Sequence, residues 1–395
     1  MAVTGNVIAR PATANRAEVL PFRAMDVLAR ANTRKAEGRD VLFMCVGQPQ
    51  APAPKAAREA ARNLIEHGSI GYTDAAGRMD LRTRIARHYV ETHGVEVDAA
   101  RIFVTTGSSA GFVLAFTLLE PGSRVALASP GYPAYRNILK ALSLEAVEIP
   151  VDETSRWALD RAALADVHER QPVQAVLAAS PANPTGTMTS PDALRDLTRY
   201  CEAEGIRFVS DEIYHRLTYP QASGIEEATA LAFSDEAIVV NSFSKYYCMT
   251  GWRIGWIVLP ERDLRTVERL GQNLYICAPE VSQVAALHAL AASDELEVVR
   301  AGYERNRNLL LDRLPRMGFG TILPIDGAFY AYVDVSPFAE DSVTFCNDLL
   351  EATGVAITPG IDFDLERGKH YVRLSFAGGE DQVAAACDRM EEWLG

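Results

Sequence analysis

Hydrophobic and polar positions between residues 100 and 260 alternate between short apolar runs and longer amphipathic stretches. The apolar runs are "RIFVTTG", "SRVALASP", "LEAVEIPV", "VQAVLAAS", "IRFVSDE" and "AIVVNSFS", and stretches such as "SPDALRDLTRYCEAEG" lie between them. Within the runs, apolar residues hardly alternate with polar ones, which is typical of strands that are covered on both faces. Strands separated by helices of about 10 to 15 residues predict βαβ units and a mostly parallel sheet.

The pattern changes toward both ends of the chain. After about residue 285, "SQVAALHALAASDELEVVRAGYERNRNLLLDRL" indicates long helical material, and the strand-like runs "GAFYAYVDV", "GVAITPG" and "HYVRLSF" follow it. Segregated helices and strands favour an α+β arrangement. We therefore expect a flexible tail at 1–15, a small α+β domain built from 16–45 and 286–395, and a large α/β domain at 46–285.

The amino-acid composition and net charge of the chain limit the kinds of molecule that it is expected to bind. The chain has 395 residues, of which 48% are hydrophobic and 23% charged, as in soluble globular proteins, and its formal net charge is −13. An acidic chain of this kind does not fit a nucleic-acid or anionic-membrane partner, because either partner favours a basic face. No secretory signal and no run of about 18 apolar residues is present. The six cysteines are scattered without a CxxC pair, so we expect a cytoplasmic protein.

The polar residues that follow each predicted strand carry the candidate chemistry. In open α/β sheets, ligands bind beyond the carboxyl ends of the strands, so these side chains should lie close together. They are Ser108, Ser109 and Ala110 after the first run, Tyr132 after the second, Asn183, then Asp211 and Tyr214, and finally Ser242, Ser244 and Lys245. The seven histidines show no HExxH or similar ligand spacing, so we expect no metal site.

This set of residues fits a planar, phosphorylated cofactor. The helix N-terminus predicted at Ser108–Ala110 would bind a phosphate, and the Arg253 guanidinium fork would close around it. A planar ring could stack on Tyr132, while Asp211 could keep a ring nitrogen protonated. Lys245 could form a Schiff base with an aldehyde on that ring. The cofactor that these requirements describe is pyridoxal 5′-phosphate (PLP).

Seven short motifs then resemble one known family. The run Ser242–Lys245, "SFSK", with "GWRIG" behind it, resembles the cofactor-lysine signature of class I/II aminotransferases, which have PLP fold type I and belong to the aspartate aminotransferase superfamily. "VGQP", "GYTDAAGRMDLR", "SPGYP", "NPTG", "SDEIY" and "YVRLSF" occur in the family's order. The resemblance implies a large domain with a mostly parallel seven-stranded sheet between helices and a smaller α+β domain. It also implies a homodimer that moves an amino group between an L-amino acid and a 2-oxo acid by a ping-pong mechanism.

The resemblance also assigns roles to the candidate site. Lys245 would be the Schiff-base lysine and then the base, Asp211 would pair with the ring nitrogen, and Tyr214 would bind the ring 3′-oxygen. Arg373 would hold the substrate α-carboxylate, with Gly47 lining the same pocket. Asn183 would contact both the ring 3′-oxygen and the substrate, and Tyr132 would contact both the ring and the substrate. The phosphate would be bound by Ser108, Ser109, Ala110, Ser242, Ser244 and Arg253, together with Tyr72 of the partner subunit.

These motifs do not distinguish between reaction types or between substrates. A PLP-dependent lyase of the same fold, such as a carbon–sulfur β-lyase or a cyclopropane-forming synthase, would share these motifs. A non-catalytic regulator of this fold is disfavoured by the complete set of catalytic residue types. Gln48, Gln50 and Ala110–Gly111 depart from the commonest family pattern without touching the chemistry. Tyr275 is a candidate side-chain pocket residue, and the absence of a recognisable second arginine does not favour a dicarboxylate substrate.

Overall fold

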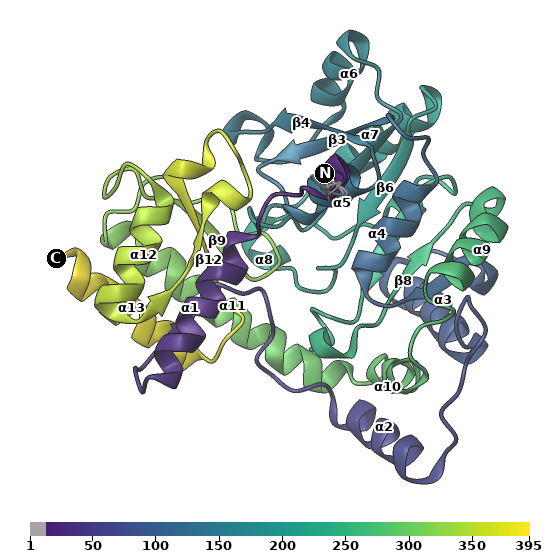
Figure 1. Cartoon of the computed structure of the whole chain (residues 1–395), viewed down its shortest axis with the longest axis horizontal. Helices are drawn as coiled ribbons and strands as arrows, with labels where there is room; N and C mark the ends of the chain where they lie inside the picture. Colours follow the sequence, from purple (N-terminus) through teal and green to yellow (C-terminus); the bar gives the residue numbers. More distant parts are fainter. Residues whose placement is uncertain (1–12) are drawn as a thin grey trace, which may run out of the picture.

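The computed structural model describes residues 13–395, and a seven-stranded sheet is its largest feature (Figure 1). The first twelve residues of the predicted tail lie outside the described range. Across the sheet the strand order is β2-β8-β7-β6-β5-β3-β4, and only β8 runs antiparallel to its neighbours. The strands are β2 (Ile102–Thr105), β3 (Arg124–Ser129), β4 (Glu145–Pro150), β5 (Ala175–Ala179), β6 (Arg207–Asp211), β7 (Ile238–Ser242) and β8 (Gly255–Val258). The predicted mostly parallel sheet is confirmed.

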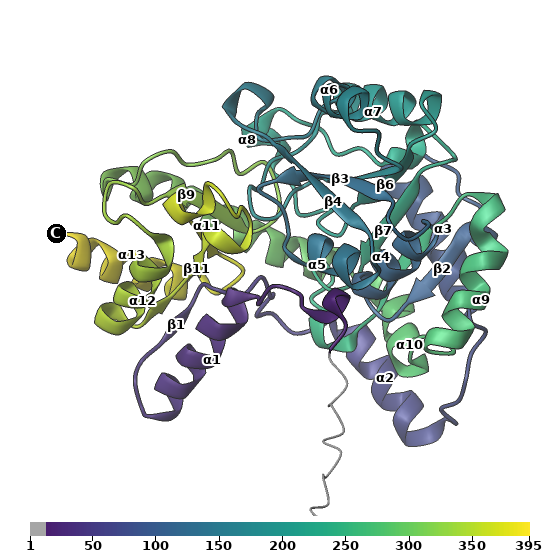
Figure 2. The same cartoon turned by 45° about the horizontal axis from the view of Figure 1, so that its top comes forward.

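Helices cover both faces of this sheet, with α6 and α7 on one side and α4 and α5 on the other (Figure 2). In β5, Val176 packs in one hydrophobic cluster with Leu194 of α7, whereas Leu177 packs in another with Phe112 of α4. Because successive strand residues point to opposite faces, burial on both faces requires the uninterrupted apolar runs seen in the sequence. The helices of this part are α2 (Lys55–His67), α3 (Met79–His93), α4 (Ser108–Thr117), α5 (Ala134–Ala141), α6 (Arg161–Arg170), α7 (Pro191–Ala203), α8 (Pro220–Ser223), α9 (Leu264–Leu274) and α10 (Glu280–Ala289).

The local sequence of α7 shows how one of these helices is specified. Ser190 precedes the helix, and its hydroxyl accepts a hydrogen bond from the Ala193 amide. Pro191 occupies the first helical position, where a missing amide hydrogen costs nothing. Leu194 and Leu197 then fall on one buried face, which packs on the sheet.

A smaller group of elements combines both ends of the chain. The short strand β1 (Leu42–Phe43) pairs in parallel with β10 (Val355–Ala356), and α1 (Arg23–Ala36) contacts β10 and β11. Beside them lies an antiparallel sheet in the order β11 (Thr358–Pro359), β12 (Tyr371–Ser375), β9 (Tyr330–Asp334). Helices α11 (Ser293–Arg316), α12 (Ser342–Thr353) and α13 (Glu380–Leu394) complete this group (Figure 1). The domain boundaries near residues 45 and 285 stay predictions.

Two segments differ in detail from the apolar pattern. The helical stretch after residue 280 is divided into α10 and α11 by a short break at 290–292. A 3₁₀ turn at Thr250–Trp252 overlaps the start of the run "GWRIGW", and Arg253 adopts a left-handed conformation with φ 50° before β8 begins at Gly255. The apolar pattern does not reveal this turn, because Trp252 and Ile254 read equally well as strand residues.

Candidate active site

The carboxyl ends of the central strands open into one cavity of about 180 Å³. Ten of the residues predicted for the site line it: Gly47, Ser108, Ser109, Tyr132, Asn183, Tyr214, Ser244, Lys245, Arg253 and Arg373. Asp211 lies just behind the wall residue Tyr135, and Ser242 is hydrogen-bonded to Ser244. Ala110 and Tyr72 are not part of the wall that residues 13–395 form. The structure therefore gathers nearly the whole predicted set around one space.

Lys245 follows β7 and carries its amine into this cavity. Its Nζ donates a hydrogen bond of 2.6 Å to the Gly47 carbonyl and lies 5.6 Å from the centre of the Tyr214 ring. The pKa of the Lys245 amine is lowered to about 7, mainly by burial and also by the positive charges of Arg373 and Arg253, while the carboxylate of Asp211 acts in the opposite direction. A substantial share of the amine is therefore unprotonated, and hence nucleophilic, at neutral pH.

Asp211 ends β6 and is almost completely buried. The Tyr135 hydroxyl donates to its Oδ2, and the Ile213 amide donates to its Oδ1 at 3.1 Å. Burial raises the pKa of the Asp211 carboxyl to about 6, although these hydrogen bonds and the nearby Lys245 act in the opposite direction. The sequence does not indicate this role of Tyr135, because the residue meets Asp211 only through the packing of α5 against the end of β6.

An anion-binding end is formed by α4 and the turn before β8. Gly107 precedes α4 with φ 81° and offers no side-chain cap, so the first amides of the helix keep free hydrogens. A Cβ atom at Gly107 would lie 2.5 Å from Nη2 of Arg253, so glycine allows the guanidinium to approach this helix end. The Ser242 hydroxyl, which donates to Ser244 Oγ at 2.9 Å, adds a further polar group to the same region.

Arg373 projects from β12 of the small sheet into the opposite end of the cavity. Its Nη1 donates to Asn183 Oδ1 at 2.8 Å, and its Nη2 donates to the Cys45 carbonyl at 2.9 Å. The guanidinium carbon lies 4.3 Å from the centre of the Tyr330 ring. Although Arg373 is only 2% exposed, its Nε has no hydrogen-bond partner among residues 13–395. A fixed guanidinium of this kind suits a carboxylate ligand.

Gly47 and Tyr330 fit together closely beside Lys245. A Cβ atom at Gly47 would lie 1.6 Å from the Tyr330 hydroxyl oxygen, so no larger residue fits at this position without displacing Tyr330. The Tyr330 hydroxyl also lies 2.7 Å from the Tyr214 hydroxyl. Tyr330 was not found from the sequence, since it stands within an apolar strand run that indicates only a core position.

Comparison with known proteins identifies the family. The model of the family described as aminotransferase class I and II matches residues 39–390. The chain belongs to this aminotransferase family. It is 46% identical over 382 residues to the valine–pyruvate aminotransferase of Mycobacterium tuberculosis, an alignment that spans 96% of this chain and 97% of that protein.

Solved structures agree with this membership. The crystal structure of an aminotransferase from Mycobacterium tuberculosis superposes with a TM-score of 0.95 at 46% identity, over 98% of this chain and 99% of that one. The aspartate aminotransferase of Thermus thermophilus with maleate superposes with a TM-score of 0.89 at 29% identity, over 97% and 100% of the two chains. The predictions of the family, of PLP fold type I and of amino-group transfer between an amino acid and a 2-oxo acid are thereby confirmed.

The rest of the cavity wall of this aminotransferase is largely apolar. Phe22 and Met25, from the start of α1, meet Ile138 of α5 at the wall, and the ring centre of Phe22 lies 6.1 Å from that of Tyr132. No sequence motif indicates these residues, because they come from the start of α1 and from α5, outside the family motifs. Tyr275, a candidate for the pocket, packs instead in the hydrophobic cluster beneath α4 and does not line the wall that the described residues form.

Proposed function

We propose that this aminotransferase uses PLP and takes its amino group from an L-amino acid with a small apolar side chain, such as valine, with pyruvate as an acceptor. The observation that carries the proposal is the composition of the single cavity. It combines the reactive amine of Lys245, the buried carboxylate of Asp211, the uncapped start of α4 and the fixed guanidinium of Arg373. The other side chains of the cavity wall are largely apolar. The name of the valine–pyruvate relative from Mycobacterium tuberculosis supports the choice of substrates.

The donor set of the cavity fits PLP. The free amides of α4 and Arg253 would hold its phosphate, with Ser108, Ser109, Ala110, Ser242 and Ser244 around them. Asp211 would pair with the protonated ring nitrogen, Asn183 and Tyr214 would bind the ring 3′-oxygen, and Tyr132 would lie against the ring. When bound, PLP supplies an aldehyde that forms a Schiff base with an amine and a ring that accepts electrons from the substrate carbon.

Lys245 is the residue that would hold and move the proton. A pKa of about 7 leaves its Nζ able both to take a proton from the substrate Cα and to return it near neutral pH. Arg373 would hold the substrate carboxylate, and this fixed orientation decides that a proton rather than carbon dioxide leaves Cα. The aromatic rings of Tyr214 and Phe329, 5.6 Å and 5.8 Å from Nζ, limit the access of water to the amine.

Preference for an apolar side chain follows from the charges in the wall. Among the described wall residues, Arg253 and Arg373 are the only arginines, and both are assigned to other anionic groups. A carboxylate in the substrate side chain would therefore lie against Phe22, Met25 and Ile138 without a positively charged partner. That arrangement costs about 3 kcal/mol, which corresponds to about 100-fold in kcat/KM.

A donor series tests both parts of the proposal. With purified holoenzyme and pyruvate, we expect kcat/KM for L-valine to exceed that for L-aspartate by about 100-fold or more. Replacement of Lys245 by Ala should abolish the transfer. A preference for aspartate would contradict the proposed substrate class. Sustained ammonia release from the donor without any 2-oxo acid would favour the lyase alternative instead of a transaminase.

We further propose a homodimer in which Tyr72 of the partner subunit completes the phosphate site. Tyr72 is 82% exposed in the single chain, the highest value among the exposed large hydrophobic side chains of the described residues, and the nearby Ile70 is 52% exposed. Ser109 and Arg253, at the phosphate end, are exposed as well. Light scattering should give twice the chain mass, and Tyr72→Ala should weaken PLP retention; a monomer with full PLP retention would contradict this assembly.

A cytoplasmic location is part of the same proposal. All six cysteines are free thiols, and five of them are buried, which is consistent with a reducing compartment. Among residues 13–395, no helix combines the length and the apolar content that crossing a bilayer requires. Fractionation of the native cells, with detection of the enzyme in the soluble or the envelope fraction, would decide the location.

A further inference from the structure

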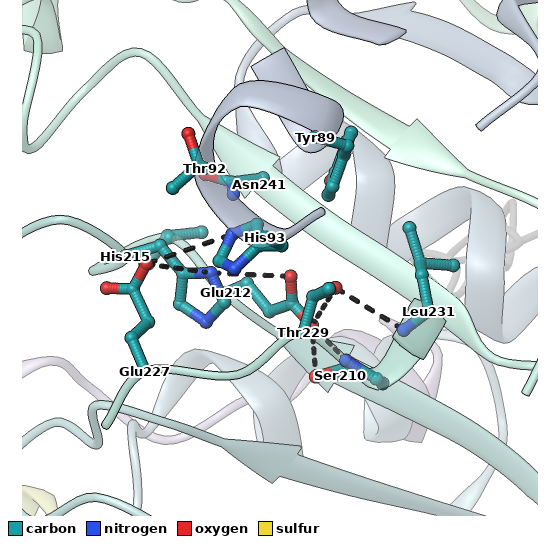
Figure 3. A network of polar contacts seen from close by, with 12 residues as sticks. Tyr89, Thr92, His93, Ser210, Glu212, His215, Glu227, Thr229, Leu231 and Asn241 are labelled. Carbon is teal, nitrogen blue, oxygen red and sulfur yellow. Dashed lines mark hydrogen bonds and ion pairs between the residues drawn. The ribbon is translucent and has the colours of Figure 1, made fainter. Parts of the chain in front are cut away.

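A second cluster of ionisable side chains lies behind the turn that carries the catalytic residues. The turn after β6 places Glu212 next to Asp211 and His215 next to Tyr214, but on the side away from the active-site cavity. There they meet His93, from the last turn of α3, and Glu227, from the segment that follows α8 (Figure 3). Three of these residues, His93, His215 and Glu227, offer ligand atoms that all lie within 4.8 Å of one another.

The separations within this cluster are close to those of a metal site. Glu227 Oε1 lies 3.8 Å from His93 Nε2 and 3.7 Å from His215 Nδ1, and Glu212 Oε2 lies 3.5 Å from the same Nδ1. Metal–ligand bonds of about 2.0 to 2.2 Å in a tetrahedral arrangement hold ligand atoms about 3.3 to 3.6 Å apart. The carboxylate oxygens would need to move by only a few tenths of an ångström, and the two histidine nitrogens, which lie within 4.8 Å of each other, by at most about 1 Å.

Two polar atoms that face the centre of the cluster make no hydrogen bond within the part of the chain that the structure describes, although they lie 3.5 Å from each other. His215 Nδ1 and Glu212 Oε2 are buried without a hydrogen bond among residues 13–395, and their side chains are 3% and 1% exposed. Unpartnered buried groups of this kind are rare and point to a ligand that satisfies them.

The opposite oxygen of each carboxylate is anchored by the protein. Glu227 Oε2 accepts a 2.5 Å hydrogen bond from the Arg216 amide. Glu212 Oε1 accepts hydrogen bonds from the Thr229 hydroxyl at 3.1 Å and the Ala230 amide at 2.9 Å. Metal-binding carboxylates are commonly fixed in this way by a second set of contacts, which orients the free oxygen toward the ion.

We propose that His93, His215 and Glu227, with Glu212 beside them, form a binding site for one divalent transition-metal ion, of which Zn²⁺ is the best match. Two imidazoles and a carboxylate suit Zn²⁺ or Co²⁺, whereas Mg²⁺ and Ca²⁺ favour sites built from oxygen alone. The ion would fix the turn that carries Asp211 and Tyr214 from behind. It takes no part in the amino transfer, because these ligands face away from the active-site cavity.

Zinc and cobalt binding to the full-length holoenzyme test this site. The protein is treated with a chelator, loaded with ZnCl₂, passed through gel filtration and analysed for metal. We expect one zinc per chain, and visible absorption bands of tetrahedral cobalt after loading with CoCl₂. His93→Gln and His215→Gln should each weaken zinc binding by more than about 100-fold, because loss of a direct ligand exceeds the effect of losing a supporting contact.

His88→Gln is the matched control. This histidine is buried beside His93 but bonds to the Thr92 hydroxyl at 3.1 Å and offers no atom to the cluster, so the variant should keep its zinc. If a His215 variant does not fold, His93→Gln and Glu227→Gln at the rim of the cluster provide the same comparison. Absence of bound metal in the wild type, or equal zinc content in the ligand variants and the wild type, would overturn the proposal.

Discussion

The hydrogen bond from Tyr135 to Asp211 is predicted to be necessary for full activity. Asp211 is 2% exposed, and within the described part of the chain its carboxylate accepts two hydrogen bonds, one from the Tyr135 hydroxyl and one from the Ile213 amide. Tyr135→Phe removes the first and keeps the ring, which packs edge-on against Phe112 at 5.3 Å. The change therefore alters the environment of one carboxylate without creating a cavity.

The size of the effect follows from the charge on Asp211. A hydrogen bond to a charged group contributes about 1.5 to 3 kcal/mol, and about 1.4 kcal/mol corresponds to a pKa change of 1. In the cofactor-free protein the pKa of Asp211 is about 6, so loss of the bond should raise it to about 7 to 8. A carboxyl that is largely protonated at pH 7 no longer stabilises a cationic ring nitrogen. The same free energy predicts a fall in kcat of about 10- to 100-fold.

The assay combines steady-state transfer from L-valine to pyruvate with PLP binding to the cofactor-free enzyme. The binding defect of Tyr135→Phe should be larger at pH 6.5 than at pH 9, because Asp211 is ionised in both proteins at high pH. Tyr303→Phe is the control, since the buried Tyr303 hydroxyl has no partner among the described residues. Unchanged kcat in Tyr135→Phe, or a binding defect that does not depend on pH, would refute this reasoning.

Three further substitutions test other parts of the site. Arg373→Lys loses the fork that contacts Asn183 and the Cys45 carbonyl, so KM for the amino donor should rise about 10-fold or more with a smaller change in kcat. Lys245→Met should abolish transfer and also alter stability. In the wild type the Lys245 pKa is about 7 instead of 10.5, so the unfolded chain binds one more proton between these values and stability rises with pH across them. From pH 7 to pH 9, urea unfolding of the cofactor-free wild type should show a gain of about 2 kcal/mol that Lys245→Met lacks. Gly47→Ala must displace the Tyr330 hydroxyl, so its melting temperature should fall by an amount that corresponds to about 1 to 3 kcal/mol. Gly302→Ala is the control: its added Cβ would meet only the Arg305 side chain at 3.8 Å, so it should not melt below the wild type.

The sequence predicted the residues that each strand presents at its own carboxyl end. Lys245, Asp211 and Asn183 follow directly from apolar runs, and a parallel sheet brings the ends of such runs together without further information. Arg373 could be assigned only through the resemblance to the family. Its strand belongs to the small sheet, and nothing within "YVRLSF" shows that this sheet packs against the cavity.

The residues that the sequence did not reveal owe their roles to partners far away in the chain. Tyr135 lies in an ordinary amphipathic helix, and its hydroxyl becomes important only where α5 packs against the end of β6. Phe22 reaches the cavity because the N-terminal segment crosses from the small sheet to the large one. Such contacts depend on tertiary packing, so hydrophobic period and local spacing give no indication of them.

The run "SDEIYH" shows most clearly why local motifs give an incomplete account of this protein. Family motifs assign Asp211 and Tyr214 to the active site, but Glu212 and His215 are equally buried and meet His93 and Glu227 on the other side of the same turn. A histidine spacing search fails here because the ligand atoms come from three separate segments. Since one short backbone segment carries both sets, any shift of His215 must also shift the neighbouring Tyr214. If the second cluster binds the proposed ion, the ion therefore limits how far Asp211 and Tyr214 can move.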